Sequence, residues 1–365
     1  MLLNRPQLSK VFGWFVGYGI CFLLMQTARD IKLYERAQST SYPHGHLDTD
    51  EEPLPMVMNL DSDVLSHQGM DNSTAVALLK KVRVLCWIVT HPKNVQAKAR
   101  HVKATWAKRC DRVLFMSSEE DKELGAIGLG TGEGRDKLYW KTIKALYYIN
   151  ENHLDDADWF LKADDDTYVI MENLKLLLVS YSPSEPIFFG RKFKYFVKQG
   201  YMSGGGGYAM SREAVRKFVE AFETGKCTHT STIEDVEVAK CLEKVGVVAG
   251  ESLDMHRRET FHGVFPEELL TKKHEQKNFW YRDYSYHPLE LGPRCCSDYS
   301  ATFHYMSPTW MYTFEYFAYH LRPYGYSHRV LPINRTAQSV LFGRSSDSSS
   351  YSQVFSSLPV DSKLR

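Results

Sequence analysis

The sequence predicts an α/β domain organised around a mainly parallel sheet. From residue 82 onward, short apolar runs rich in β-branched residues alternate with stretches in which apolar residues recur at helical spacing. A run that is apolar at every position indicates a strand buried on both faces, as in parallel sheets. Alternating strands and helices are typical of right-handed crossovers that cover such a sheet. An acidic triplet after one predicted strand adds a candidate site at the carboxyl edge of the sheet.

The first predicted strand is VRVLCWIVT at residues 82–90, where the folded domain begins. Apolar residues at helical spacing between 95 and 106 predict a helix behind it. Ser211 is a suitable N-cap for a later helix. The remaining elements, in chain order, are a strand at 112–116, a helix at 138–149, a strand at 159–163, a helix at 172–180, a short strand at 187–189 and a helix at 212–222.

The composition indicates a folded protein that does not bind nucleic acid. In a chain of 365 residues, 45 Lys and Arg side chains are balanced by 44 Asp and Glu, which leaves a formal net charge of +1. Nucleic-acid binding requires an excess of basic side chains on one face, and this balance provides none. The hydrophobic fraction of 43% is sufficient for a substantial core and excludes disorder throughout the chain.

An uncharged stretch near the amino terminus predicts a membrane anchor. Residues 11–28 contain no charged side chain and are just long enough to cross a bilayer as a helix. A cleaved signal peptide would need small residues near the end of this stretch, but LLMQ occupies 23–26. The preceding charges in residues 1–10 are all positive, which predicts a cytosolic tail and a single-pass type II protein. Such a short span suits an early secretory membrane.

The lumenal part is expected to have three regions. Residues 29–80 are polar and rich in Pro and acidic side chains, which predicts a flexible stem. The folded domain is expected at 81–330, and the Ser-rich tail at 331–365 is expected to be disordered. Asn72 and Asn334 begin Asn-x-Thr sequons, which agree with a lumenal surface.

The cysteines also fit an oxidising compartment. Cys21 lies within the predicted span, which leaves an even number for the lumenal part. No pair has the C-x-x-C spacing of a zinc site. Three disulfides could therefore form among Cys86, Cys110, Cys227, Cys241, Cys295 and Cys296, and the spacing alone leaves every connectivity open.

The most informative stretch is DWFLKADDDTYV at 158–169, where three carboxylates follow a buried strand. Adjacent carboxylates repel one another unless a cation compensates them. In extended geometry Asp164 and Asp166 share one side, while Asp165 points away. Two carboxylates that hold a divalent cation leave coordination positions for phosphate oxygens. The sequence therefore predicts a metal site that binds a nucleotide diphosphate.

Two other interpretations of the triplet need no such site. A solvated acidic turn, or a cap for the helix that begins near Met171, would place the same residues without a metal. An EF-hand loop is excluded, because Val169 occupies the position that requires Gly and Lys175 replaces the final Glu.

Several sequence blocks are distinctive in combination: VKATW (102–106), GRDKLYWKT (134–142), DWFLKADDDTYV (158–169), YMSGGGGYAMS (201–211), IEDVEV (233–238), CCSD (295–298), and FHYM with HLRPYGY (303–306, 320–326). Together they closely resemble the core 1 β1,3-galactosyltransferase family, within the fringe-like β1,3-glycosyltransferase superfamily. The resemblance runs from about Val82 to Tyr326. It implies a nucleotide-sugar transferase fold of the GT-A type. It also implies inverting transfer of galactose from UDP-galactose to GalNAc on Ser or Thr, Mn²⁺ dependence, Golgi residence and a homodimer.

The resemblance assigns Asp164 and Asp166 as metal ligands and adds an imidazole. Spacing from the Glu-Asp pair resembles fringe proteins for His262, whereas the FHY block favours His304, which we take as the third ligand. Either histidine could instead be satisfied by a local hydrogen bond.

The resemblance also assigns Asp235 as the general base, which takes the proton of the acceptor hydroxyl as that hydroxyl attacks. Taken without the resemblance, Glu234 and Asp235 are better explained as negative charge at a helix amino terminus.

The remaining site predictions rest mainly on position within matched blocks. The Gly204–Gly207 run would allow close approach of a ligand, or would form only a tight connection. Trp280 in FWYRDYSY is the candidate for acceptor contact, although a core or dimer surface would have the same composition. The candidates for UDP contact are Thr90, Arg135, Asp136, Trp140 and Lys141.

In the setting of this resemblance, chain order favours Cys86–Cys110 and Cys227–Cys241. A direct Cys295–Cys296 bond would close a small ring, and pairing across protomers is an alternative.

Two rival functions remain: a transferase that uses another UDP-sugar, and a non-catalytic chaperone of such an enzyme. A dedicated chaperone is also an expected partner, and a chaperone itself would be expected to lack the intact triplet. A metal-assisted hydrolase would need a second carboxylate cluster to activate water, which the sequence lacks.

Overall fold

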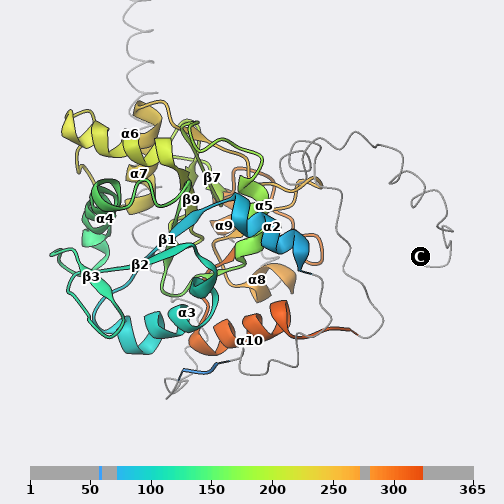
Figure 1. The fold of residues 1–365 in the computed structure, drawn as a ribbon. Coiled ribbons are helices and arrows are strands. Elements are labelled where there is room, and N and C mark those ends of the chain that lie inside the picture. The colour runs from blue at the N-terminus through green and yellow to red at the C-terminus, as the bar shows by residue number, and fades with distance from the viewer. Residues whose placement is uncertain (1–56, 60–71, 272–279, 324–365) are drawn as a thin grey trace, which may run out of the picture. The chain divides into compact units, whose positions relative to one another are not determined.

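A mixed sheet forms the centre of the computed structural model, which describes residues 57–59, 72–271 and 280–323. Its seven strands lie in the order β10-β6-β9-β4-β1-β2-β3 (Figure 1). All neighbours pair in parallel except β9, which is antiparallel to both β4 and β6. The strands are β1 (Val84–Val89), β2 (Arg112–Ser117), β3 (Ala126–Gly128), β4 (Trp159–Asp164), β6 (Ile187–Gly190), β9 (Tyr208–Ser211) and β10 (Val248–Ala249).

Helices cover both faces of the sheet, and β1 explains why. All six of its residues are buried. Leu85, Trp87 and Val89 join one core with α4 (Leu138–Asn152), α6 (Arg212–Glu223) and α7 (Glu234–Lys244). The alternate residues of β1 join a second core with α3 (Arg100–Ala104), α5 (Met171–Leu178) and α10 (Pro308–Tyr319), on the other face (Figure 1). The continuous apolar run is therefore a two-faced strand, as predicted.

Ser211 ends β9 and caps α6, since its hydroxyl accepts a hydrogen bond from the backbone N–H of Ala214. The helix predicted between 95 and 106 is divided into a π-helical turn at Val95–Ala99, α3, and a 3₁₀ turn at Trp106–Arg109. A further 3₁₀ turn at Arg135–Lys137 precedes α4. Two short helices, α8 (Pro266–Leu270) and α9 (Trp280–Tyr284), lie in the later part of the described chain.

Helix α2 (Ser73–Lys81) lies in residues that the sequence assigns to the end of the stem. It buries Leu78, which joins the core of α5. The folded part of the described chain therefore starts ahead of the predicted boundary at 81.

Two small sheets complete the fold. One has the order β11-β12-β5 and the other pairs β7 with β8. Their strands are β5 (Tyr168–Val169), β11 (Phe261–His262), β12 (Thr302–Phe303), β7 (Lys192–Phe193) and β8 (Tyr201–Met202).

Within the described residues, no helix combines the length and apolar character needed to span a bilayer. The predicted anchor at 11–28, most of the stem, Asn334 and the tail at 331–365 lie outside the described residues.

Candidate active site

The acidic triplet lies at the carboxyl edge of the sheet, as predicted. Strands β1 and β4 run in parallel, with Val89 opposite Asp164, so both chains leave the sheet at the same edge. Asp165 turns away from its two neighbours. Its carboxylate accepts hydrogen bonds from the Thr90 hydroxyl at 2.7 Å and from the Asn94 amide at 2.9 Å. Burial and the neighbouring carboxylate raise the pKa of Asp165 to about 7.

The other two carboxylates converge with His304. One potential ligand atom from each of Asp164, Asp166 and His304 lies within 4.8 Å of the others. A local strand pair brings this distant histidine to the triplet. Strand β5 follows the aspartates, and β12 precedes His304; the two pair in antiparallel fashion, with Tyr168 opposite Phe303. The backbone N–H of Met306 also donates to the Asp166 carbonyl at 2.8 Å.

Each member of this group is oriented by a neighbour. Lys162 Nζ lies 2.5 Å from Asp164 Oδ1, and Lys98 Nζ lies 3.1 Å from Asp166 Oδ2. His304 Nδ1 lies 3.3 Å from the Gly263 carbonyl. Because a carbonyl can only accept, Nδ1 carries the proton and Nε2 is left as the ligand atom. Nε2 is also the atom nearest Asp166, at 3.3 Å from Oδ1.

The charges around the group match a cation. Burial by itself would raise the pKa of Asp166, but the contacts of its carboxylate with His304 and with the Lys98 ammonium outweigh it and hold that pKa below its usual range. Two carboxylates and an imidazole are a donor set that suits Mn²⁺ and similar divalent ions. Hydrogen bonds to metal ligands from neighbouring groups, such as those made here by Lys162 to Asp164 and by His304 to the Gly263 carbonyl, orient the ligands of metal sites in proteins. The residues present therefore fit a divalent cation.

The Gly204–Gly207 run makes room for this arrangement. A Cβ at Gly205 would lie 2.0 Å from His304 Cε1, and one at Gly204 would lie 2.8 Å from Glu234 Oε2. Gly207 has φ +75°, where a side chain would be strained. Close packing of the site's own side chains thus explains the glycines at these positions.

His262 lies on β11 and belongs to the core. It is 1% exposed, its Nε2 is 2.9 Å from the Ser300 hydroxyl, and its ring stacks on Phe303. Burial lowers the pKa of His262 to about 3. Within the described residues, His304 and not His262 joins the acidic group.

Asp235 and Glu234 begin α7 but serve different contacts. Glu234 is 8% exposed, and its carboxylate accepts hydrogen bonds from the Thr142 and Tyr208 hydroxyls at 3.0 and 2.7 Å. Asp235 is partly exposed and accepts from the Gly204 backbone N–H at 3.2 Å. Burial raises the pKa of both carboxyls above their usual values.

Lys162 connects Asp235 with the acidic group. Its ammonium donates to the Asp164 carboxylate and, at 2.9 Å, to the carbonyl of Gly204. The N–H of Gly204 in turn donates to the Asp235 carboxylate. The Lys162 side chain is only 5% exposed, and this burial by itself would lower its pKa. The surrounding carboxylates more than offset that effect, so the pKa of Lys162 is raised. Sequence reasoning missed Lys162 and Lys98. A lysine within an otherwise apolar strand, as in WFLKA, is the signal that could have revealed the first.

The predicted UDP contacts fall into two groups. Thr90 and Lys141 are buried: Lys141 Nζ donates to the Thr90 carbonyl at 2.9 Å and pairs with Glu133 at 3.0 Å. Arg135, Asp136 and Trp140 are exposed. Asp136 pairs with Lys137, and the Trp140 indole stacks on His229 with ring centroids 4.4 Å apart. Burial raises the pKa of Tyr305, the ring stacked on His304, to about 12, and the charge of Arg135 opposes that rise.

Trp280 is partly buried at the start of α9, in an aromatic cluster. Its ring lies 5.9 Å from Phe193, which also contacts Tyr201 and Tyr284. Besides burial, the main cause, the charge of Asp235 contributes to the raised pKa of Tyr201. Tyr201 lies on β8, which packs against α7, the helix that carries Asp235, so the cluster lies beside that helix.

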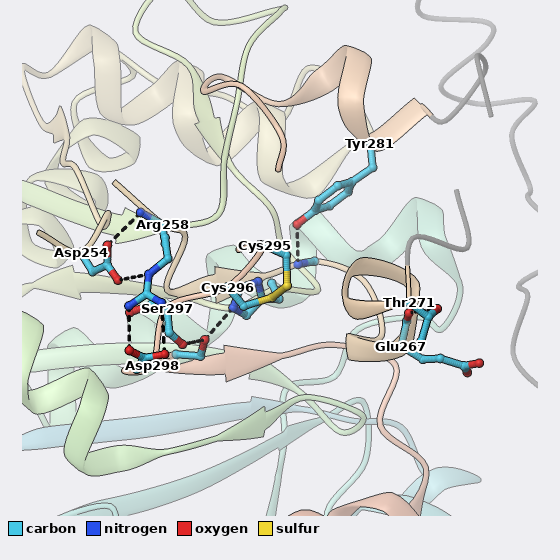
Figure 2. Close-up of a disulfide and its surroundings, with 12 residues drawn as sticks. Asp254, Arg258, Glu267, Thr271, Tyr281, Cys295, Cys296, Ser297 and Asp298 are labelled. Carbon is cyan, nitrogen blue, oxygen red and sulfur yellow. Dashed lines mark hydrogen bonds and ion pairs between the residues drawn. A yellow bond between two sulfur atoms is a disulfide. The ribbon is translucent and has the colours of Figure 1, made fainter. Parts of the chain in front are cut away.

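Three disulfides are present among the described residues. Cys86–Cys110 and Cys227–Cys241 are the two expected pairs. Cys295 and Cys296 bond directly to each other (Figure 2). This adjacent pairing is the first of the two alternatives considered from the sequence.

Comparison with known proteins identifies the family. The Fringe-like family model matches residues 80–290, more than half of the chain. Glycoprotein-N-acetylgalactosamine 3-beta-galactosyltransferase 1 of Xenopus laevis is 55% identical over 267 residues, which cover 73% of this chain and 74% of the relative. The chain belongs to the core 1 β1,3-galactosyltransferase family within the Fringe-like proteins. The resemblance noted from the sequence blocks is thereby confirmed.

Two more distant relatives share only part of their length with this chain. A beta-1,3-glucosyltransferase of Mus musculus is 27% identical over 183 residues, 49% of this chain and 37% of the relative. Chondroitin sulfate synthase 3 of Homo sapiens is 28% identical over 203 residues, 50% of this chain and 23% of the relative.

Proposed function

We propose that this protein transfers galactose from UDP-galactose, in β1,3 linkage and with inversion, to the GalNAc of GalNAc-Ser/Thr glycoproteins. The observation that carries the proposal is the group formed by Asp164, Asp166 and His304, together with Asp235. The chain that holds this group is 55% identical to the Xenopus glycoprotein-N-acetylgalactosamine 3-beta-galactosyltransferase 1. The central parallel-rich sheet, with the group at its carboxyl edge, supports a GT-A fold.

The proposed cofactor is Mn²⁺, held by Asp164, Asp166 and His304. Bound there, the ion supplies charge neutralisation for the diphosphate of the leaving UDP. Lys162 and Lys98 orient the two carboxylates through their ion pairs with Asp164 and Asp166. Because the leaving group needs no protonated acid, a single further carboxylate is sufficient for the chemistry.

That carboxylate is Asp235, the proposed general base. Its side chain is partly exposed, whereas Glu234 is buried and bonded to Thr142 and Tyr208. In an inverting reaction the base takes the proton of the acceptor hydroxyl as that oxygen attacks the anomeric carbon. A raised pKa makes Asp235 a stronger base than a solvated aspartate.

The cellular setting is proposed from the sequence and the disulfides. Three disulfides are consistent with a secretory lumen. We propose a Golgi type II protein anchored by residues 11–28, active as a homodimer and assisted by a dedicated chaperone. The glycoprotein acceptor is supported by the name of the Xenopus relative.

A transferase that uses another UDP-sugar is the main alternative, because one relative, with 27% identity, is named as a beta-1,3-glucosyltransferase. The test is a panel of UDP-sugars against GalNAc-peptides, with the full chain, with and without Mn²⁺. The proposal expects that, of the UDP-sugars tested, only UDP-galactose extends the GalNAc to a disaccharide, and only when Mn²⁺ is present. Equal transfer from UDP-glucose or UDP-GlcNAc would favour the alternative, and no transfer at all would favour a non-catalytic chaperone.

A further inference from the structure

A buried chain of contacts leads from the Cys295–Cys296 turn to His304. The residues along it contribute no ligand atom and no base to the proposed reaction. Its nearest part is Gly263, whose carbonyl accepts from His304 Nδ1 at 3.3 Å. The N–H of the same glycine donates to the Tyr281 hydroxyl at 3.0 Å (Figure 2). Tyr281 therefore holds Gly263 at its N–H, in the peptide group next to the one whose carbonyl contacts the imidazole.

Tyr281 is itself rigidly held. Its side chain is 0% exposed, and the Arg191 guanidinium lies 4.8 Å from the centre of its ring. Arg191 also donates to the Ser285 hydroxyl, which donates in turn to the Tyr281 carbonyl. These contacts fix both the ring and the backbone of Tyr281.

The far end of the chain of contacts is an ion pair between Arg191 and Glu259. Both residues are buried, at 1% and 7% exposure. Backbone pairing holds Glu259 against the disulfide turn: Glu259 forms a bridge with Cys296, and the Ser297 N–H donates to the Glu259 carbonyl at 2.9 Å. The disulfide turn thus supports Glu259, and Glu259 supports Arg191.

Gly263 is closely packed within this link. A Cβ on Gly263 would lie 3.0 Å from the Ser203 hydroxyl and 3.3 Å from Tyr281 Cε2. Ser203 is tied to the same network, because its N–H donates to the Arg191 carbonyl at 2.8 Å. Any displacement of Tyr281 would therefore move Gly263 and the acceptor of His304.

We propose that Tyr281, held by the Arg191–Glu259 ion pair, is a positioning residue that aims His304 Nε2 at the divalent cation. This inference rests on the proposed metal site. It gives the aromatic segment at 280–284 two separate tasks: Trp280 lies in the aromatic cluster near Asp235, while Tyr281 supports the metal ligand.

The test is a titration of the purified full chain with Mn²⁺ alone, followed by the electron paramagnetic resonance signal of the free ion. Tyr281→Phe keeps the ring and removes the acceptor for the Gly263 N–H. The matched control is Tyr284→Phe, in the same helix and packed on the same Phe193 ring. The proposal expects Tyr281→Phe to raise the Kd for Mn²⁺ about tenfold, as loss of an outer-shell partner does, with the Tyr284→Phe value unchanged.

Excess metal separates positioning from damage to the fold. The proposal expects Tyr281→Phe to reach the wild-type stoichiometry at about tenfold higher Mn²⁺, because the ligands remain in place. An unchanged Kd in Tyr281→Phe overturns the proposal, as does a lower stoichiometry that excess Mn²⁺ does not restore. If Tyr281→Phe does not fold, the second variant is Ser285→Ala, which removes the hydroxyl between Arg191 and the Tyr281 carbonyl. The proposal expects this variant to bind Mn²⁺ more weakly than wild type, by a smaller factor than Tyr281→Phe. An unchanged Kd for Mn²⁺ in Ser285→Ala would contradict the proposal.

A His304→Ala arm distinguishes this inference from the metal site itself. If wild type binds no Mn²⁺, or if His304→Ala binds it as tightly as wild type, the metal site is wrong and the inference is overturned with it. If His304→Ala weakens binding and Tyr281→Phe does not, only the role of Tyr281 is wrong.

Discussion

Glu234 and Asp235 are neighbours in sequence, but their surroundings give them different roles. The Glu234 carboxylate is enclosed by hydroxyls from α4 and β9, while the Asp235 carboxylate bonds the backbone of the glycine run. At the residue scale, this difference favours Asp235 as the residue available to an acceptor hydroxyl.

We expect Asp235→Asn to lower kcat by about a hundredfold to ten-thousandfold, the usual contribution of a general base. UDP affinity should remain near the wild-type value, because Asp235 is outside the Asp164, Asp166 and His304 group. Single-turnover kinetics and UDP calorimetry measure the two effects. Glu234→Gln, which keeps a carbonyl acceptor for its hydroxyl partners, is the control and should lose much less activity. Full turnover by Asp235→Asn would place the base elsewhere.

His262 offers a prediction in which stability, and not metal binding, responds to pH. Its pKa is about 3 in the folded protein against 6.5 as its ordinary value. Below pH 6.5 the unfolded chain therefore binds a proton that the folded protein does not. The free energy of unfolding should fall as the pH decreases from 6.5 towards 3, by at most about 1.4 kcal/mol per pH unit from this group.

Replacing His262 by Asn should flatten that part of the pH–stability curve and leave the Kd for Mn²⁺ unchanged. His304→Ala should do the reverse, with a large rise in the Kd for Mn²⁺ and little change in the acid dependence attributed to His262. Denaturant unfolding at several pH values and Mn²⁺ titration measure the two quantities. Loss of Mn²⁺ binding in the His262 variant would show that the wrong histidine has been chosen.

Some of this detail was within reach of the sequence. Asp164 and Asp166 could be predicted because extended geometry places alternate residues on one side. The prediction of His304 as a ligand needed the family resemblance. Only two-residue strands bring His304 to the triplet, and strands that short show no period in the sequence. Lys98 and the Gly263 carbonyl could not be predicted, because their contacts depend on how distant segments pack.

At the scale of elements, the long strands and helices follow the sequence pattern closely. Strand β1 and helix α6 carry clear signals: a run apolar throughout, and a helical period behind a serine cap. Strands β5, β11 and β12 have two residues each, too few to show any period. Helix α10 has aromatic residues on several sides, so its sequence shows no single apolar stripe. Helix α2 directly follows a polar segment, so the sequence assigns it to the end of the stem.

The disulfides give a prediction at this scale, because they close loops of very different length. Cys86–Cys110 has a sequence separation of 24, whereas Cys295–Cys296 has a separation of 1. From loop entropy, replacing both Cys86 and Cys110 by Ala should lower the unfolding free energy by about 3 kcal/mol. Replacing both Cys295 and Cys296 by Ala should lower it by about 1 kcal/mol or less.

Denaturant unfolding of the two double variants, in parallel with wild type, measures these losses. Equal losses in the two variants would contradict the loop-entropy account and would mean that the Cys295–Cys296 bond stabilises the fold through its local contacts.

At the scale of the whole molecule, the site is assembled where the main sheet and a small sheet meet. Strand β4 supplies Asp164, the β5–β12 pair brings His304, and α7 presents Asp235. Lys162 joins these parts, since it contacts Asp164 and the carbonyl of the glycine whose N–H bonds Asp235. One buried ammonium group therefore links the proposed cation site with the proposed base.

The most direct test of the central claim is calorimetric titration of the full chain with UDP-galactose, before and after chelation of divalent metal. We predict that binding requires Mn²⁺, disappears on chelation, returns when Mn²⁺ is restored, and is lost in an Asp164→Asn/Asp166→Asn double variant. Unchanged UDP-galactose affinity after full chelation, or in the double variant, would contradict a donor site built on a cation at this edge of the sheet.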